Sequence, residues 1–339
     1  MSKRGPTLED VAREAGVSRA TVSRVVNGVR NVDPRIQDVV RRAISRTGYT
    51  PNQAARSLVT RRTGAVALVF SAVGEACAAR VFADPFFGRV VDGAVGFLRE
   101  RTVQPVLLVA ESEQARGQVA QYLRQGAADG ALVVSLDADD PLPAMLVAAG
   151  VPTVLFGRPP GRLRAGHVDL DNAAGARLAA GHLLARGRRR LATIGAPGSA
   201  PAARDRLDGF RSALAEAGIT DVPVVRGRFT AESGREAMAR LLREHPGLDG
   251  VFAANDLMAQ GACQYLRERG LAVPGDIAVV GFDDSRAATE CRPGLTTVRQ
   301  PVEEMAAAMA RLLVEQLRGG TGDGSRTLFE PVLVVRESA

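Results

Sequence analysis

Short apolar runs alternate with helix-length amphipathic stretches over most of this 339-residue chain, and this alternation constrains the fold more than any other feature. The apolar runs read AVALVF (65–70), PVLLVA (105–110), GALVVS (130–135), PTVLF (152–156), LATIG (191–195), GVFAA (250–254) and IAVVGF (277–282). Between them lie stretches such as FGRVVDGAVGFLRER and DRLDGFRSALAEAG. Strands that alternate with helices form parallel sheets with helices on both faces. We therefore predict an α/β region that is long enough for two such sheets.

The first 62 residues differ from the rest of the chain in charge. They carry 13 Lys and Arg against 5 Asp and Glu, a net charge of +8, whereas the net charge of the remaining residues is −1. A basic module attached to a nearly neutral body is typical of a phosphate-binding surface. A solubilising basic tail would lack apolar periodicity, and this segment has it. We therefore expect the segment to fold and to contact nucleic acid.

Capping residues and apolar spacing predict three helices within residues 1–50. Thr7 precedes the first helix and Gly16 ends it, Ser18 precedes the second helix, and Asp33-Pro34 begins the third. Two helices joined by a glycine turn and supported by a third make a helix-turn-helix domain. In such a domain the second helix enters the major groove of DNA.

The second helix therefore carries most of the candidate DNA contacts. Its outward residues can meet phosphates or base edges. With the capping residues, the candidates are Thr7, Ser18, Arg19, Ala20, Thr21, Ser23, Arg24 and Asn27. We expect Arg19, at the start of the helix, to contact a guanine, and the alternative is a solvated surface arginine.

The segment TLEDVAREAGVSRATVSRVVNG resembles the DNA-binding signature of the LacI/GalR family, and the similarity continues through DPRIQDVVRRAISRTGYTPNQAARSL. The resemblance implies a hinge helix within residues 51–62 that orders only on DNA and pairs with its dimer mate in the minor groove. It implies that Leu58 wedges a central base step, that Ala55 lies at the helix–helix contact and that Asn52 belongs to the DNA-binding set. An apolar wedge of this kind unstacks a base step and bends the duplex. A simple linker is the alternative.

Polar and aromatic residues stand after several of the predicted strands or at the start of the helices that follow. Ligands of open parallel sheets bind at the carboxyl ends of the strands. Carboxylate, amide and guanidinium groups can hold pairs of hydroxyls, and an aromatic ring can cover the C–H face of a sugar. The candidates are Phe86, Arg158, Arg206, Phe229, Asn255 and Asp283. Each has an ordinary alternative, since Asn or Asp after a strand is commonly a helix cap and a phenylalanine is commonly core.

Residues 63–339 are also similar to the effector domain of the LacI/GalR family, which is related to periplasmic sugar-binding proteins. The similarity rests on DPFF, VDLDNAAGARLAAGHLLARG, RDRLDGFRSALAEAG, DGVFAANDLMAQGA, VPGDIAVVGFDDS and LTTVRQPVEEMA. It implies a two-lobed, type I periplasmic-binding-protein-like domain. Arg206, Phe229, Asn255 and Asp283 would contact the effector, with Arg158 and Phe86 near them. It also implies a homodimer, with the helices after Asn255 and after Asp283 at the interface.

Two features depart from the family pattern. Residues 71–83, SAVGEACAARVFA, are longer and more apolar than the stretch usually found before DPFF. Gly157-Arg158 stands where some relatives have a carboxylate, which puts a guanidinium near the ligand. We therefore predict a small-molecule effector, a sugar or a sugar derivative, without naming it.

Two other classes of protein were weighed. Alternating strands and helices host many enzymes, but GxGxxG after the first strand, GxxxxGK[ST] and GxSxG are absent, and His167, His182 and His245 lack metal-ligand spacing. A solute-binding protein for a transporter would need an export signal, and the N-terminus has no apolar core after its basic residues. Neither alternative explains the basic first 62 residues.

The three cysteines, Cys77, Cys263 and Cys291, fit neither a disulfide framework nor a metal site and suit a reducing cytoplasm. The longest apolar runs are too short to span a membrane. The sequence therefore predicts a cytoplasmic, nucleoid-associated transcriptional regulator, most often a repressor in this family. We expect it to bind palindromic double-stranded operator DNA as a homodimer, without enzymatic activity, cofactor, metal or membrane partner.

Overall fold

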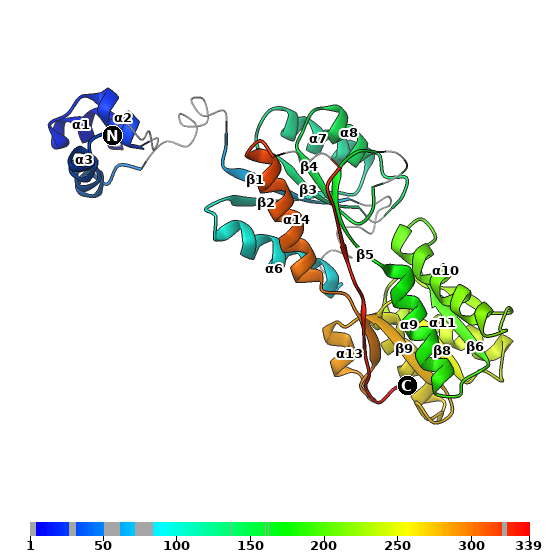
Figure 1. The fold of residues 1–339 in the computed structure, drawn as a ribbon. Coiled ribbons are helices and arrows are strands. Elements are labelled where there is room, and N and C mark those ends of the chain that lie inside the picture. The colour runs from blue at the N-terminus through cyan, green and yellow to red at the C-terminus, as the bar shows by residue number, and fades with distance from the viewer. Residues whose placement is uncertain are drawn as a thin grey trace. The chain divides into compact units, whose positions relative to one another are not determined.

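The computed structural model describes most of the chain, which divides into two compact units, Met1–Thr63 and Gly64–Ala339 (Figure 1). The described residues are 5–26, 32–50, 62–71, 84–135, 137–159, 161, 163–320 and 324–339. Four predicted DNA contacts, Asn27, Asn52, Ala55 and Leu58, lie outside these ranges. Residues 72–83 of the unusual apolar segment also lie outside them.

The first unit contains the predicted helix-turn-helix. Its helices are α1 (Leu8–Ala15), α2 (Arg19–Val26) and α3 (Pro34–Thr47). Thr7 and Asp10 form a capping box, in which each side chain accepts a hydrogen bond from the other residue's backbone N–H. Gly16 takes a φ of 66° between α1 and α2, a conformation that glycine adopts without strain. The three helices bury a small core of Val11, Val22, Val40 and Ala43.

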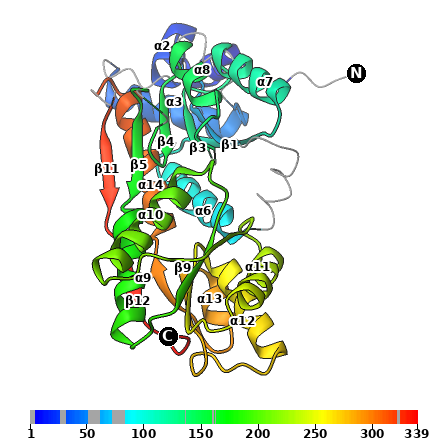
Figure 2. The same cartoon turned by 90° about the vertical axis from the view of Figure 1, so that its right-hand side faces the viewer.

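The second unit contains two sheets, which together with their helices form two lobes (Figures 1 and 2). Among the described residues each sheet has six strands. The first sheet has the order β11-β5-β4-β3-β1-β2, with β1 Ala65–Ser71, β2 Gln104–Ala110, β3 Ala131–Ser135, β4 Thr153–Phe156, β5 Gly166–Leu170 and β11 Arg326–Phe329. The second has the order β12-β10-β9-β8-β6-β7, with β6 Leu191–Gly195, β7 Val224–Arg226, β8 Gly250–Ala253, β9 Ala278–Asp283, β10 Thr296–Arg299 and β12 Val332–Val334. The order of strands is thus equivalent in the two lobes.

Helices cover both faces of each sheet. The first lobe has α6 Pro85–Arg99, α7 Glu113–Arg124, α8 Leu142–Ala148 and α14 Val302–Leu317. The second lobe has α9 Asn172–Ala185, α10 Pro201–Glu216, α11 Ala231–Glu244, α12 Asp256–Glu268 and α13 Arg286–Glu290. None of the helices in the described part of the chain combines the length and the apolar character that spanning a bilayer requires.

Strand β1 shows why the central strands read as continuous apolar runs. Val66, Leu68 and Phe70 belong to the core shared with α6 and α14, whereas Ala67 and Val69 belong to the core shared with α7 and α8. Successive side chains of a strand point to opposite faces of the sheet. Because both faces are covered by helices, every position of the strand is apolar.

The chain crosses between the lobes at three places. These lie between β5 and α9 at Asp171, between β10 and α14 at Gln300-Pro301, and between β11 and β12 at Glu330-Pro331. The crossings place the carboxyl ends of β4 and β9 on either side of the junction between the lobes. This junction is where ligands of such folds bind.

The last apolar segment, LFEPVLVV (328–335), reads in the sequence as one strand, but it does not form a single strand in the structure. The chain forms two strands in different sheets, β11 parallel to β5 and β12 antiparallel to β10. Pro331 has no N–H to continue a ladder, and the chain passes from one lobe to the other at this residue. The β10–β12 pair also makes the second sheet mixed rather than wholly parallel.

Candidate functional site

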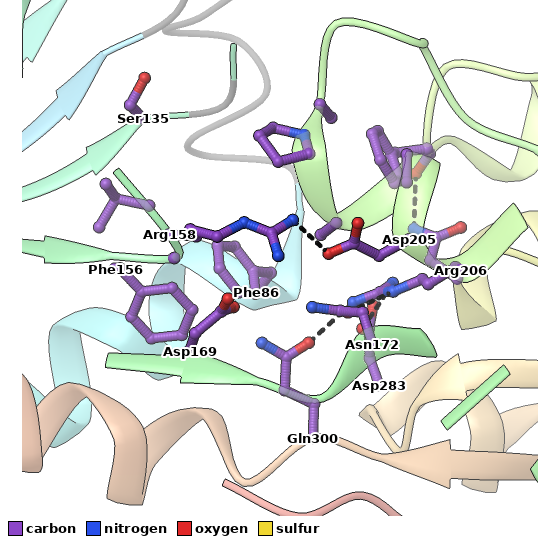
Figure 3. Close-up of a pocket in the computed structure, with 18 of the residues that line it drawn as sticks. Phe86, Ser135, Phe156, Arg158, Asp169, Asn172, Asp205, Arg206, Asp283 and Gln300 are labelled. Atoms are coloured by element: carbon purple, nitrogen blue, oxygen red, sulfur yellow. Dashed lines mark hydrogen bonds and ion pairs between the residues drawn. The ribbon is translucent and has the colours of Figure 1, made fainter. Parts of the chain in front are cut away.

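A cavity of about 140 Å³ lies between the two lobes of the second unit (Figure 3). Its wall includes all six residues that the sequence singled out: Phe86, Arg158, Arg206, Phe229, Asn255 and Asp283. Polar lining residues that the sequence reasoning did not single out are Asp84, Ser135, Asp169, Asn172, Asp205 and Gln300. The structure therefore brings together residues that are up to 216 positions apart in the chain.

Arg206, in the second turn of α10, is the most densely bonded of these side chains. Its guanidinium donates to Asn172 Oδ1 at 2.9 Å, Gln300 Oε1 at 2.9 Å, the Ala254 carbonyl at 2.6 Å and Asp283 Oδ1 at 3.4 Å. It also stacks over the ring of Phe282 at 3.6 Å. Burial lowers the pKa of Arg206, and the charges of Asp283 and Asp256 oppose that shift. An arginine stays protonated in proteins, so this buried cation fixes the acceptors around it.

The contact between α9 and α10 brings Arg206 to Asn172. A Cβ atom on Gly209 would lie 2.3 Å from the backbone oxygen of Ala173, so only glycine lets α10 pack this closely on α9. Asn172 begins α9 directly after one crossing between the lobes, and Gln300 stands at another. Arg206 therefore ties together two of the segments that join the lobes.

Asp283 ends β9 with a φ of 107°, a backbone conformation that non-glycine residues rarely adopt. Strain of about 1–3 kcal/mol of this kind persists only where the surroundings hold it. Arg89 on α6 does so by donating to the Asp283 carbonyl at 3.0 Å while it pairs with Glu303 on α14 at 2.6 Å. Burial raises the pKa of Asp283 to about 6, and the charge of Arg206 limits the rise. Its carboxyl is therefore mostly ionised at neutral pH.

Asn255 is both a helix cap and part of the cavity wall. Its Oδ1 accepts a hydrogen bond from the Met258 N–H at 3.0 Å, which caps α12. Its Nδ2 donates to the Phe229 carbonyl at 3.1 Å, and Phe229 has a φ of 64°. Asn255 is thus a helix cap, which was the alternative to a ligand contact. The same side chain also holds the turn that places Phe229 at the cavity.

The first lobe contributes mainly aromatic rings. Phe86 meets Phe156 edge to face, with ring centroids 5.4 Å apart. Arg158, just after β4, reaches across the cleft to Asp205 on α10, with Nη2 2.7 Å from Oδ2 (Figure 3). Burial raises the pKa of Asp169, at the end of β5, and a hydrogen bond from the Leu170 N–H opposes the rise. This side of the cavity therefore combines an apolar wall with one charged pair that spans the lobes.

Three of the residues that the sequence reasoning missed obey the same rule as those it found. Asp169 and Asn172 stand at the end of β5 and the start of α9, and Gln300 follows β10. They were missed because β5 and β10 were not recognised as strands. Both strands are short, and β5, GHVDL, alternates buried and half-buried residues instead of forming an apolar run.

Carboxylates, amides and guanidiniums converge on one space beside aromatic rings, which suits a ligand rich in hydroxyl groups. Within the described ranges no group of His, Cys, Asp and Glu could hold a metal ion. The lining residues that the structure describes also include no histidine, cysteine or lysine.

The remaining predicted contacts lie at the start of α1 and on or directly before α2 in the first unit. Ser18, Arg19, Ala20 and Arg24 are exposed, and Thr7, Thr21 and Ser23 are half-buried. Arg19 pairs with Glu9 of α1 at 3.1 Å, with both side chains more than half exposed. An exposed pair of this kind contributes about 0–1 kcal/mol, so Arg19 can leave Glu9 for a base at little cost.

Known proteins are similar to this chain over nearly its whole length. Residues 7–52 match the lacI family of bacterial regulatory proteins, and residues 180–339 match the periplasmic binding protein-like domain. The chain is 46% identical to the HTH-type transcriptional regulator CelR of Thermobifida fusca over 99% of both chains. It is 33% identical to the ribose operon repressor of Escherichia coli (strain K12), over 98% of this chain and 99% of the repressor.

Solved structures show the same similarity. A complex of the transcriptional regulator CelR with cellobiose is 45% identical, with a TM-score of 0.77 over 98% of this chain and 100% of that one. The lac repressor dimer bound to operator and the anti-inducer ONPF is 27% identical, with a TM-score of 0.85 over 99% of both chains. The chain is therefore a DNA-binding transcriptional regulator and belongs to the LacI family.

Proposed function

We propose that this regulator binds a palindromic operator as a homodimer through α2, and that a small carbohydrate in the cavity controls its affinity for DNA. The observation that carries the proposal is the convergence of Arg206, Asn255 and Asp283 with the ring of Phe86 on one cavity between two lobes. CelR, a relative at 46% identity, has a solved complex with cellobiose, so cellobiose is the first ligand to test. The lac repressor dimer on its operator supports the dimeric form on DNA.

The mechanism we propose is linkage between two binding sites. A ligand that touches both lobes binds one lobe arrangement better than the other, and it must therefore shift the equilibrium between arrangements. Residues 1–50 would read DNA, residues 51–62 would form the hinge, and residues 63–339 would hold the effector and dimerise. The protein acts as a repressor at the nucleoid, in the cytoplasm, by binding rather than by catalysis.

Selection of bound sites from random duplex DNA tests the proposal. It is run near physiological salt, with and without a panel of sugars that includes cellobiose. We expect a palindromic site and at least one sugar that changes its occupancy. If no site emerges under any condition, or if no sugar changes binding to the site, the proposal is contradicted.

A pair of variants sharpens the assignment of α2. Arg19→Ala should weaken binding to the selected site by about 5- to 150-fold, because a lost bidentate base contact costs roughly 1–3 kcal/mol. Arg13→Ala, on α1, removes the same charge from another exposed position of the first unit and serves as the matched control. Fluorescence anisotropy on the selected and a scrambled duplex measures both. Equal losses for the two variants would show that α2 is not the reading helix.

A further inference from the structure

The charges of the described residues in the cavity wall do not balance. Among the described residues, six charged side chains line it: Asp84, Asp169, Asp205, Asp283, Arg158 and Arg206. Four carboxylates against two guanidiniums give a formal charge of −2. A ligand in the cavity meets this excess at short range.

Arg158 is the only cation of the described cavity wall that is substantially exposed, and it is already neutralised. Its Nη2 lies 2.7 Å from Asp205 Oδ2, so the pair spans the cleft from β4 to α10 (Figure 3). Asp169 lies close enough to both that the charge of Arg158 lowers its pKa and the charge of Asp205 raises it. One guanidinium therefore faces two carboxylates.

Arg206 cannot take the role of an anion receptor either. It is 6% exposed, and three of its four hydrogen-bond acceptors, Asn172, Gln300 and the Ala254 carbonyl, are neutral groups at 2.6–2.9 Å. Its charge is opposed by Asp283, which lies 3.4 Å away on the same cavity wall. An incoming phosphate would have to displace these partners from a buried site, which leaves their oxygens unpaired.

We infer that the effector site selects for uncharged sugars and rejects sugar phosphates and sugar acids, with the Arg158–Asp205 pair as the element that sets this selectivity. The inference rests on the proposed carbohydrate function. The physical reason is that like charges repel more strongly beside partly buried carboxylates, such as that of Asp283, than they do in bulk water. The hydroxyls of a neutral sugar, in contrast, can donate to the carboxylates in charge-assisted hydrogen bonds.

This selectivity places the regulator in a sequence of reactions. Its effector must be supplied by import without phosphoryl transfer, or by hydrolysis of a longer neutral glycan. The signal must end when a hydrolase or a kinase consumes the neutral sugar. A transport reaction that phosphorylates the sugar as it enters would not supply a ligand for this cavity.

Calorimetry on the full-length protein tests the inference. The probes are cellobiose, maltose, glucose and ribose, each with a monophosphate ester of the same sugar. We expect at least one neutral sugar to bind and its phosphate to bind on the order of 100-fold more weakly. In Asp205→Asn, which frees Arg158 and removes one negative charge, the phosphate should gain about tenfold or more, while the neutral sugar changes only a few-fold.

Glu216→Gln is the matched control. Glu216 lies on the same helix and pairs with Arg177 at 2.7 Å outside the cavity. Its substitution by glutamine removes one negative charge, as Asp205→Asn does. It should leave the discrimination between neutral and phosphorylated sugar unchanged.

Three outcomes would overturn the inference. A phosphate that binds the wild-type protein as well as its neutral sugar shows that the site does not exclude anions, while the carbohydrate function stands. An unchanged ratio in Asp205→Asn, or an equal change in Glu216→Gln, removes the Arg158–Asp205 pair from selectivity. If no sugar of either class binds the wild-type protein, the carbohydrate function fails and the inference falls with it.

Discussion

The second lobe supplies buried, internally bonded polar groups to the cavity, whereas the first lobe supplies aromatic rings, an exposed arginine and the carboxylates of Asp84 and Asp169. Arg206 and Asn255 are 6% and 3% exposed, and each is held by hydrogen bonds within the protein. The side chain of Arg158 is 54% exposed and pairs with Asp205 on the opposite lobe. The two lobes share a strand order, so this difference arises from side chains and not from topology.

The difference predicts that the two lobes contribute to ligand binding in different ways. Groups that are already fixed lose little entropy when a ligand binds, so they give directional recognition. An aromatic wall gives contact area that depends on closure of the cleft more than on exact geometry. Substitutions in the second lobe should therefore cost more effector affinity than substitutions in the first.

Arg206→Ala should have the largest effect, a loss of effector affinity of at least about 100-fold. The buried oxygens of Asn172 and Gln300 would lose their donor, and each unpaired group costs about 1–3 kcal/mol. Operator binding should remain while the response to the effector disappears. Calorimetry with the sugar and anisotropy with the operator measure the two properties separately.

Arg158→Ala is the control from the first lobe, and it should change neutral-sugar affinity only a few-fold because the lost pair is largely solvated. A larger loss in Arg158→Ala than in Arg206→Ala would reverse the proposed division between the lobes. Thermal unfolding of both variants shows whether either change acts through stability instead.

The pH dependence of effector binding should come from the second lobe. Burial raises the pKa of Asp283 to about 6, so its carboxyl is ionised at pH 7.5 and about nine-tenths protonated at pH 5. If the ionised carboxylate accepts hydrogen bonds from the sugar, affinity should fall about tenfold over this range. Titration calorimetry at several pH values measures it.

Asp283→Asn should bind more weakly than the wild type at pH 7.5 and should show a flatter pH profile. A wild-type affinity that does not change between pH 7.5 and 5 would show that the ionised form of Asp283 is not the one that binds.

The elements that the sequence predicted well are those whose causes are local. Thr7, Gly16 and Asp33 cap or end helices through contacts within a few residues, and each does so in the structure. Strand β1 was recognisable because its two covered faces make an unbroken apolar run. By contrast, β5 was missed because two of its five residues are only partly buried, although it lies inside its sheet.

The site was predictable in part for the same reason. Asn255 and Asp283 follow apolar strands, so the rule that ligands bind at strand ends points to them. The pairing of Arg158 with Asp205, 47 positions apart and on different lobes, depends on how the lobes close. The common strand order of the lobes also left no visible repeat in the sequence, because many different apolar residues satisfy the same buried positions.

The smallest effect should come from the aromatic wall of the first lobe. Phe86→Leu keeps an apolar side chain at the start of α6 but removes the flat ring that faces the cavity beside Phe156, so effector affinity should fall about two- to fivefold. Phe97→Leu is the matched control, since Phe97 lies on the same helix, is buried and does not line the cavity. It should cost about 1 kcal/mol of unfolding free energy and leave sugar affinity unchanged. A Phe86→Leu loss as large as that of Arg206→Ala would mean that the first lobe recognises the ligand as specifically as the second, because contact area alone cannot account for a 100-fold effect.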